Sequence, residues 1–157
     1  MYEREVDVPR LVARAPARGV GSGVLQELSR VLSHRYEVRL DSISLALYRN
    51  GDDSVAPHGD KMGPLRQDTV IAIVSLGAPR RFNLRAVDGS VRASFALGAG
   101  DLLVMGGSCQ ETFLHGVPKV RWAEPRMSIQ FRQTLPEAVA KAWPESLTAS
   151  RPVRLGS

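Results

Sequence analysis

The stretch that decides the fold is residues 69–105, which read TVIAIVSLGAPRRFNLRAVDGSVRASFALGAGDLLVM. It opens on a β-branched, almost wholly apolar run, as expected of a strand that is buried on both faces. Further along, Asp88-Gly89 is a dipeptide typical of a tight hairpin turn. The stretch therefore predicts four short strands separated by turn residues, at 69–76, 81–87, 90–97 and 102–105.

The same kind of segment continues on both sides of this stretch. Residues 42–48 (SISLALY) alternate in period two, and two more short strands are predicted at 111–115 and 126–132. Residues 24–34 (VLQELSRVLSH) instead space their apolar side chains for one face of an amphipathic helix. One helix followed by many short strands predicts a mainly β fold, an antiparallel sandwich or barrel with jelly-roll-like closure as the leading choice.

We expect a single domain over residues 1–135. A short strand, Tyr2 to Val8, should end at the proline that follows it, and a Pro/Gly-rich connection, 15–23, should lead to the helix. Residues 136–157 contain a helix-prone stretch (PEAVAKAW) and a Ser/Pro/Arg tail, so we expect a short C-terminal helix and then disorder.

Composition excludes some classes of protein. The 157 residues contain no apolar run near the roughly 20 that a membrane span needs, and the N-terminus, MYEREVDVPR, lacks the apolar core of a secretory signal. A single cysteine, Cys109, excludes an internal disulfide framework and favours the reducing cytoplasm. The net charge of +5 permits an anionic partner without requiring one.

Three polar residues stand out against this β background. His58 and Asp60 are two residues apart, so in an extended segment they point to the same side, and His115 lies at the end of a later predicted strand. Two histidines and one carboxylate on one face of an octahedron form the facial triad of non-haem iron(II) oxygenases. The alternative is that the pair is an ordinary surface loop feature, as His34 at the predicted helix end is expected to be.

A second pattern lies in residues 126–132 (RMSIQFR). On a strand, Arg126, Ser128, Gln130 and Arg132 share one face. If this face points into a barrel, the arginines need an anion, and a dicarboxylate would supply it. If it points to solvent, they only make the surface soluble. The two arginines are six residues apart, or roughly 20 Å along a strand, so they cannot serve one small carboxylate equally.

These residues together resemble the AlkB family of iron(II)/2-oxoglutarate-dependent dioxygenases. The resemblance covers roughly residues 42–132, in the order of the family, with an upstream match at YEREVDVPRL. It is carried by four stretches, LYRNGDDSVAPHGDKMG, DTVIAIVSLGAPRRFNLR, LGAGDLLVMGGSCQETFLHGVPK and PRMSIQFR. The combination of His-x-Asp, a later His, and two Arg six residues apart is highly specific.

The resemblance implies a fold, cofactors and site residues. The fold is a double-stranded β-helix (jelly-roll) core over residues 42–132, with the N-terminal helix packed on it. The cofactors are Fe(II), 2-oxoglutarate as co-substrate, and dioxygen. The implied iron ligands are His58, Asp60 and His115. The distal carboxylate of 2-oxoglutarate would be bound by Arg126, helped by Tyr48 and Ser128, with Arg132 nearer the iron; for Tyr48 a purely structural place in the core is the alternative.

The resemblance also implies an activity. Methylated bases, in DNA as first choice and RNA as second, would be oxidatively dealkylated with release of formaldehyde, succinate and CO2, by a cytoplasmic monomer without a membrane partner. Two rival functions are a related dioxygenase acting on protein or small molecules, and a vestigial nucleic-acid-binding jelly roll.

The chain departs from the family pattern in three places. Ala46 stands where several members have an asparagine, and Pro57 stands where close relatives often have Trp. The chain also begins inside what resembles the substrate lid, so we expect residues 1–10, with Tyr2 and Arg4, to be a remnant of it.

The predicted hairpin offers a separate hint of an anionic partner. With Asp88-Gly89 as a two-residue loop, Arg85 would face Arg92 across the hairpin. Like charges placed opposite each other destabilise a hairpin, and phosphate contact would explain them. The alternative is a solvated face on which the two side chains splay apart.

Overall fold

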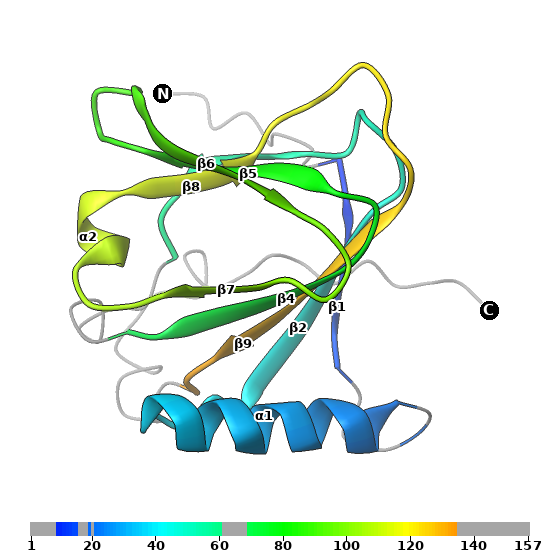
Figure 1. Cartoon of the computed structure of the whole chain (residues 1–157), viewed down its shortest axis with the longest axis vertical. Helices are drawn as coiled ribbons and strands as arrows, with labels where there is room; N and C mark the ends of the chain where they lie inside the picture. The colour runs from blue at the N-terminus through cyan, green and yellow to red at the C-terminus, as the bar shows by residue number, and fades with distance from the viewer. Residues whose placement is uncertain (1–8, 16–18, 20, 61–68, 135–157) are drawn as a thin grey trace, which may run out of the picture.

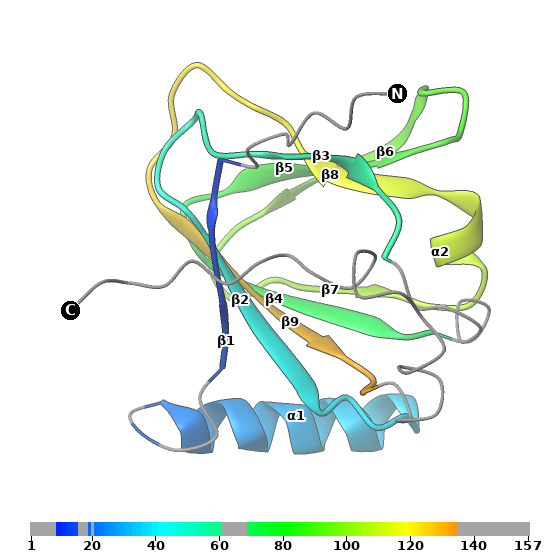
Figure 2. The ribbon, with the colours of Figure 1, turned by 180° about the vertical axis from the view of Figure 1, so that it is seen from behind.

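Two antiparallel sheets face each other, and one helix covers the outer side of the larger sheet (Figures 1 and 2). The computed structural model describes residues 9–15, 19, 21–60 and 69–134. The five-stranded sheet has the order β1 (Leu11–Arg14), β2 (Ser42–Tyr48), β9 (Arg126–Arg132), β4 (Ile71–Gly77) and β7 (Leu102–Met105). The four-stranded sheet has the order β3 (Val55–His58), β8 (Leu114–Val117), β5 (Arg80–Arg85) and β6 (Val91–Leu97). The mainly β, jelly-roll prediction is thereby confirmed.

Period-two alternation gives the larger sheet two different faces. On β9, Ile129 and Phe131 pack toward the helix, while the residues between them face the space between the sheets. Strand β2 pairs with β9 in a register that sets Tyr48 opposite Arg126 and Ser42 opposite Arg132. The central strands therefore bring one apolar face to the helix and one mixed face to the interior.

The helix α1 (Ser22–Tyr36) closes the outer face of this sheet. Leu32 and Leu40 are buried there against Phe131 and their neighbours. Two helix serines fix the return of the chain toward β2, since the Ser29 hydroxyl donates to the Leu40 carbonyl at 2.6 Å and Leu40 N–H donates to Ser33 Oγ at 2.9 Å. The helix predicted at 24–34 is confirmed, with about one more turn than predicted.

The interior between the sheets holds a second apolar cluster. It consists of Ala46, Tyr48, Ile71, Ile73, Phe82, Leu97, Met105 and Val117. Both sheets contribute side chains to this cluster. Its packing therefore fixes the position of one sheet relative to the other, and with it the position of the polar residues between them.

Several strand predictions hold at residue level. Strands β2, β7 and β9 have the predicted bounds, and β4, β5 and β6 differ from theirs by a few residues at their ends. The predicted strand Tyr2–Val8 and the C-terminal helix and tail lie outside the described residues.

The predicted strand at 111–115 is wrong. The chain forms a single helical turn, α2 (Cys109–Thr112), and the strand β8 begins only at Leu114. The carbonyl of Ser108 accepts from the amides of both Glu111 and Thr112, which winds the backbone before it extends. A one-turn helix has no room for helical periodicity, so the sequence pattern could not reveal it.

The hairpin prediction is right in part. Phe82 faces Phe95 and Asn83 faces Ser94 as predicted, but Arg85 faces Val91 and not Arg92. The loop is longer than two residues, because a turn closes at Gly89, whose φ of 85° suits glycine, and a register shift follows between Leu84 and Arg85.

Each arginine of the hairpin has a local partner instead. Arg92 lies 3.6 Å from Asp88, and Arg85 donates to the Gly89 carbonyl at 2.7 Å. The repulsion that suggested a phosphate contact is therefore absent from this hairpin.

No helix in the described part of the chain is long and apolar enough to cross a membrane.

Candidate active site

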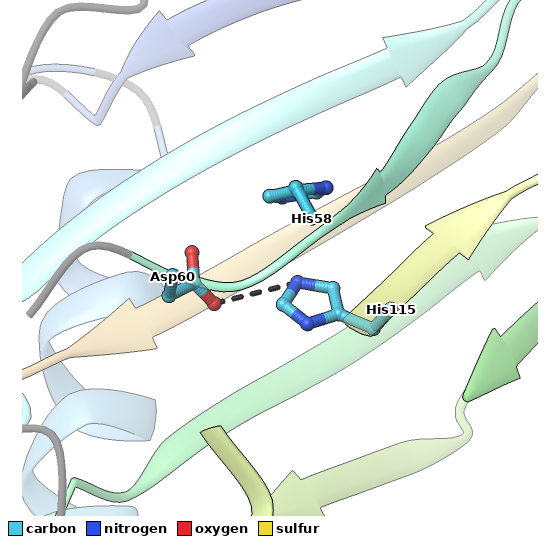
Figure 3. A group of neighbouring side chains, drawn as sticks. All are labelled: His58, Asp60 and His115. Carbon is cyan, nitrogen blue, oxygen red and sulfur yellow. Dashed lines mark ion pairs between the residues drawn. The ribbon is translucent and has the colours of Figure 1, made fainter. Parts of the chain in front are cut away.

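Three side chains from the smaller sheet and the segment after it converge in the interior (Figure 3). His58 ends β3, Asp60 follows two residues later, and His115 lies on β8, where it is the direct cross-strand partner of His58. Their ligand atoms all lie within 4.8 Å of one another. The structure thus brings together the three residues that the sequence predicted as metal ligands.

The residue after His115 explains how the two strands come so close. A Cβ on Gly116 would stand 2.8 Å from the Val55 carbonyl oxygen and 3.1 Å from the Pro57 nitrogen. Only glycine leaves room for the β3 backbone here. Pro57 is tolerated because β3 is an edge strand, where a missing amide hydrogen costs no ladder bond.

The histidines are arranged to present a lone pair. Nδ1 of His58 lies 2.8 Å from the Ala56 carbonyl oxygen, so it donates there as N–H and leaves Nε2 as the free acceptor. His115 is 5% exposed, and its ring stacks on Phe82 with centroids 5.6 Å apart. Burial lowers the pKa of His115 to about 4, so its ring is neutral at neutral pH.

Asp60 is held by two neighbours and keeps one oxygen free. Arg132 donates from Nη2 to Oδ1 at 2.9 Å, and the Asp60 amide donates to Gln110 Oε1 at 3.1 Å. Burial alone would raise the pKa of this carboxyl, but the Arg132 guanidinium, helped by the two imidazole rings, outweighs burial, and the pKa lies below its usual value.

The free oxygen is Oδ2, which is buried, has no hydrogen-bond partner, and lies 3.4 Å from Nε2 of His115. A buried carboxylate oxygen without a donor is unfavourable unless a cation satisfies it. The donor set of two imidazoles and one carboxylate fits a divalent iron ion in the facial-triad arrangement.

A polar cavity adjoins these residues. His58, His115 and Phe82 contribute to its wall from the smaller sheet, and the inward face of β9 contributes Arg126, Ser128, Gln130 and Arg132 from the larger one. The residue pattern left two orientations open for this face, and the inward one is the one that the structure shows.

A chain of hydrogen bonds runs along this face. Arg132 donates to Ser44 Oγ at 3.1 Å, Ser44 donates to Gln130 Oε1 at 2.8 Å, and Gln130 Nε2 donates to Ser128 Oγ at 2.7 Å. The chain begins at the residue that holds Asp60 and fixes the side chains along the cavity wall.

Arg126 lies at the far end of β9 from Arg132. It is 1% exposed, donates from Nη2 to Ser75 Oγ at 2.9 Å, and leaves its buried Nε without a partner. Burial lowers the pKa of Arg126, which reflects an environment that disfavours its charge. No carboxylate pairs with it among the described residues, so an anion entering the cavity would gain a preformed partner.

Tyr48 lies behind the cavity wall. It is 2% exposed within the interior cluster, and its hydroxyl accepts a hydrogen bond from Arg10 Nη1 at 3.0 Å. The guanidinium carbon of Arg126 is 5.3 Å from its ring centroid. The ring thus supports Arg126, while Ala46, in the same cluster, offers only a methyl group.

Three residues near the site were given no role in the sequence analysis. Gln130 shares the period-two face of β9, so that pattern already contained the signal for it. Arg10 precedes β1 and Gln110 lies in the one-turn helix α2, and neither position has a periodicity that points to the cavity.

The predicted substrate residues are not gathered at this site by the described structure. Tyr2 and Arg4 lie outside the described residues. Arg85 and Arg92 lie in the β5–β6 hairpin with the local partners given above.

Comparison with known proteins finds relatives for most of the chain. The model of the 2OG-Fe(II) oxygenase superfamily matches residues 9–148. The human alpha-ketoglutarate-dependent dioxygenase alkB homolog 3 is 32% identical over 130 residues, covering 76% of this chain and 46% of that protein. The bovine protein of the same name is 34% identical over 113 residues, covering 66% of this chain and 40% of that protein. The chain thus spans less than half the length of these two relatives.

Solved structures agree on the fold. A prolyl hydroxylase from Trichoplax adhaerens, solved with a hypoxia inducible factor peptide fragment, aligns with a TM-score of 0.64 at 16% identity, over 91% of this chain and 72% of that one. A Pseudomonas putida prolyl-4-hydroxylase aligns with a TM-score of 0.53 at 15% identity, over 80% of this chain and 73% of that one. At such identities the likeness concerns the fold alone.

Proposed function

Because the chain belongs to the 2OG-Fe(II) oxygenase superfamily and is AlkB-like, we propose that it is a dioxygenase that removes methyl groups from nucleic-acid bases by oxidation. Membership of the superfamily implies Fe(II) as the bound metal ion, 2-oxoglutarate as the co-substrate and dioxygen as the oxidant. The observation that carries the proposal is the buried Oδ2 of Asp60, which has no hydrogen-bond partner and lies together with ligand atoms of His58 and His115, all within 4.8 Å of one another.

Each residue has a stated part in this proposal. His58, Asp60 and His115 would hold the iron through Nε2, Oδ2 and Nε2, respectively. Arg132 keeps the Asp60 carboxylate charged and turned toward the metal, since it occupies Oδ1 and leaves Oδ2 free. The outer partners thus orient the ligands, as in other metal sites.

The cavity that adjoins the metal residues and reaches Arg126 would hold the co-substrate. Its distal carboxylate would pair with the buried Arg126, whose planar guanidinium can bind both oxygens of a carboxylate. Ser128 lines the same wall and contributes a hydroxyl, and Tyr48 supports the guanidinium from behind. When bound, Fe(II) and 2-oxoglutarate supply the oxidation by dioxygen that yields succinate and CO2 and hydroxylates a methyl group, which then leaves as formaldehyde.

A methylated base in DNA is the preferred substrate in this proposal, with RNA second. A base inside a duplex cannot reach a metal between two sheets, so the target must be flipped out or already single-stranded. The net charge of +5 favours a polyanion over a neutral partner.

The test is a panel of substrates incubated with Fe(II), ascorbate, 2-oxoglutarate and air. It comprises single-stranded DNA with methylated bases, the same sequence as RNA, the unmethylated DNA, and a proline-containing peptide. We expect mass spectrometry to show loss of methyl groups from the methylated oligonucleotides, with formaldehyde and succinate as products. Turnover of the peptide without demethylation would overturn the proposed substrate class, and the His58→Ala variant provides the inactive control.

A further inference from the structure

Three arginines line the cavity, and they differ in what balances their charge. Arg132 is paired with the Asp60 carboxylate. Neither Arg10 nor Arg126 has a carboxylate partner in the part of the chain that the structure describes. Two cations that are withdrawn from water without an anion are unfavourable, so this wall is built to receive negative charge.

The two unpaired arginines converge on one ring. The guanidinium carbon of Arg10 lies 5.9 Å from the centroid of Tyr48, and that of Arg126 lies 5.3 Å from the same centroid. Arg10 is also tied there by its hydrogen bond from Nη1 to the Tyr48 hydroxyl, 3.0 Å long. Both guanidinium groups therefore lie beside the same ring and contribute to the wall of the same cavity.

Each of the two guanidinium groups has one N–H group without a hydrogen-bond acceptor. Nε of Arg10 and Nε of Arg126 are both buried and have no hydrogen-bond acceptor. Their other recorded bonds go to neutral hydroxyls, Tyr48 for Arg10 and Ser75 for Arg126. A carboxylate has two oxygens and four acceptor sites, which is enough for both arginines.

A third arginine near the ring has a different part. Arg80 is also buried and lies 5.7 Å from the Tyr48 centroid, but it donates to the backbone carbonyls of Asn50, Asp53 and Pro118. Its bonds thus fix the loops at this end of the molecule, and it does not line the cavity.

We propose that Arg10 is a second binding residue for the distal carboxylate of 2-oxoglutarate, which it shares with Arg126, and that it sets the preference for a dicarboxylate over a monocarboxylate. The inference rests on the proposed function, because it requires that 2-oxoglutarate binds here. It adds a residue outside the β9 pattern, contributed by the segment that leads into β1.

The experiment measures binding and does not depend on turnover. The full chain, loaded with Fe(II) in the absence of dioxygen, is titrated calorimetrically with 2-oxoglutarate and with 2-oxopentanoate, which has the same carbon chain but ends in a methyl group. The variants are Arg10→Ala and Arg10→Gln, of which the second keeps a donor for the Tyr48 hydroxyl. Arg14→Ala, which alters an exposed arginine on β1, is the matched control.

We expect both Arg10 variants to bind 2-oxoglutarate about tenfold to a hundredfold more weakly than wild type, as loss of a hydrogen bond to a charged group predicts. Affinity for 2-oxopentanoate should not change, and Arg14→Ala should resemble wild type with both ligands. Unchanged 2-oxoglutarate affinity in Arg10→Gln would overturn the proposal. An equal loss of affinity for both ligands would also overturn the proposal, since it would mean that Arg10 only holds Tyr48 in place and does not bind the carboxylate. A wild-type protein that binds no 2-oxoglutarate would instead refute the proposed function, and this inference with it.

Discussion

A carboxylate oxygen that is buried without a donor, such as Oδ2 of Asp60, is stable only beside a cation, and the surrounding residues are arranged around that requirement. Arg132 satisfies the other oxygen, and Gln110 holds the backbone of the same residue. The ligands were predictable because His-x-Asp places two donors on one side of an extended segment. Gln110 and Arg10 were not, because each reaches the site through the tertiary fold from a position without periodicity.

The first prediction concerns the metal ligands. Replacing His58, Asp60 or His115 by alanine should weaken Fe(II) binding at least tenfold and abolish turnover, because each change removes one of three protein ligands. The measurements are metal titration and succinate production. His34→Ala, which alters an exposed histidine near the end of α1, is the control and should retain both. Full activity in any of the three ligand variants would remove that residue from the metal site.

The second prediction concerns Arg126. Arg126→Ala should cost about 2–5 kcal/mol of 2-oxoglutarate binding while it leaves Fe(II) affinity nearly unchanged, because a desolvated carboxylate loses its charged partner. Arg126→Lys should restore only part of the loss, since an ammonium cannot reproduce the planar fork. Anaerobic titration of the iron-bound protein measures both effects, and equal affinity in wild type and Arg126→Ala would contradict the assignment.

The third prediction concerns pH. His115 has a folded-state pKa of about 4 because of burial, below its ordinary value of 6.5. Between these values the unfolded chain binds a proton that the folded protein does not, so stability should be full above pH 6.5 and decline as the pH falls toward 4. The loss should be on the order of 3 kcal/mol at its largest.

Urea unfolding of the metal-free protein at several pH values, with a chelator present, measures this slope. His115→Asn should flatten it, and His34→Asn should not. A slope that is the same in wild type and His115→Asn would show that His115 does not titrate as its buried environment requires.

At the scale of the elements, strands with one apolar and one mixed face were predictable from the sequence. Strands whose place depends on the tertiary fold, such as an edge strand, were not. Strands β2 and β9 were predicted residue for residue, because each buries one apolar face against α1 and turns a mixed face inward. Strand β3 contains Pro57, which argues against a strand unless it lies at a sheet edge, and a sequence does not reveal which strand is the edge. Strand β1 was missed because its four residues lie directly between Pro9-Arg10 and the Pro/Gly-rich connection that begins at residue 15, so no turn signal marks it as a separate strand.

The fourth prediction belongs to the pairing of β3 with β8. Gly116→Ala should destabilise the protein by about 1–3 kcal/mol, because the added Cβ would meet the Val55 carbonyl at 2.8 Å and push the strands apart. Since His58 and His115 are cross-strand partners next to this contact, Fe(II) affinity should fall as well. A substitution at Gly89 serves as the comparison, because it would strain the backbone without a steric clash. Nothing lies within 4 Å of its Cβ position, but its φ is 85°. Gly89→Ala should therefore lower stability without changing metal affinity, and a Gly116→Ala protein with wild-type metal binding would contradict the argument.

At the scale of the whole molecule, the two sheets keep the metal residues and the arginine end of the cavity on facing walls. The smaller sheet, with β3 and β8, contributes the histidines, and the larger sheet contributes the inward face of β9. Figure 1 shows β8 and β9 in the two facing sheets. The apolar cluster between the sheets, with Tyr48 and Phe82 in it, holds this separation fixed. The mainly β fold was predictable from the many short strand patterns that follow one helix. The register of the β5–β6 hairpin was not, because it depends on a bulge that the turn residues Asp88-Gly89 do not reveal.

The fifth prediction concerns nucleic acid. If the chain binds single-stranded oligonucleotides, a net charge of +5 should make that affinity decrease steeply with salt, because neutralised phosphates release counterions. Fluorescence anisotropy over a range of salt concentrations measures the slope. Arg92→Ala should reduce it only slightly, since Arg92 already lies 3.6 Å from Asp88. An affinity that is independent of salt would show that phosphate contacts do not contribute.

The most direct test of the account is the formation of succinate from 2-oxoglutarate by the wild-type chain and by Asp60→Ala, with Fe(II), dioxygen and a methylated single-stranded oligonucleotide. The account predicts that wild type forms succinate together with formaldehyde, that both depend on Fe(II), and that Asp60→Ala forms neither. Succinate formation that persists in Asp60→Ala, or its absence in a wild-type protein that binds Fe(II), would contradict it.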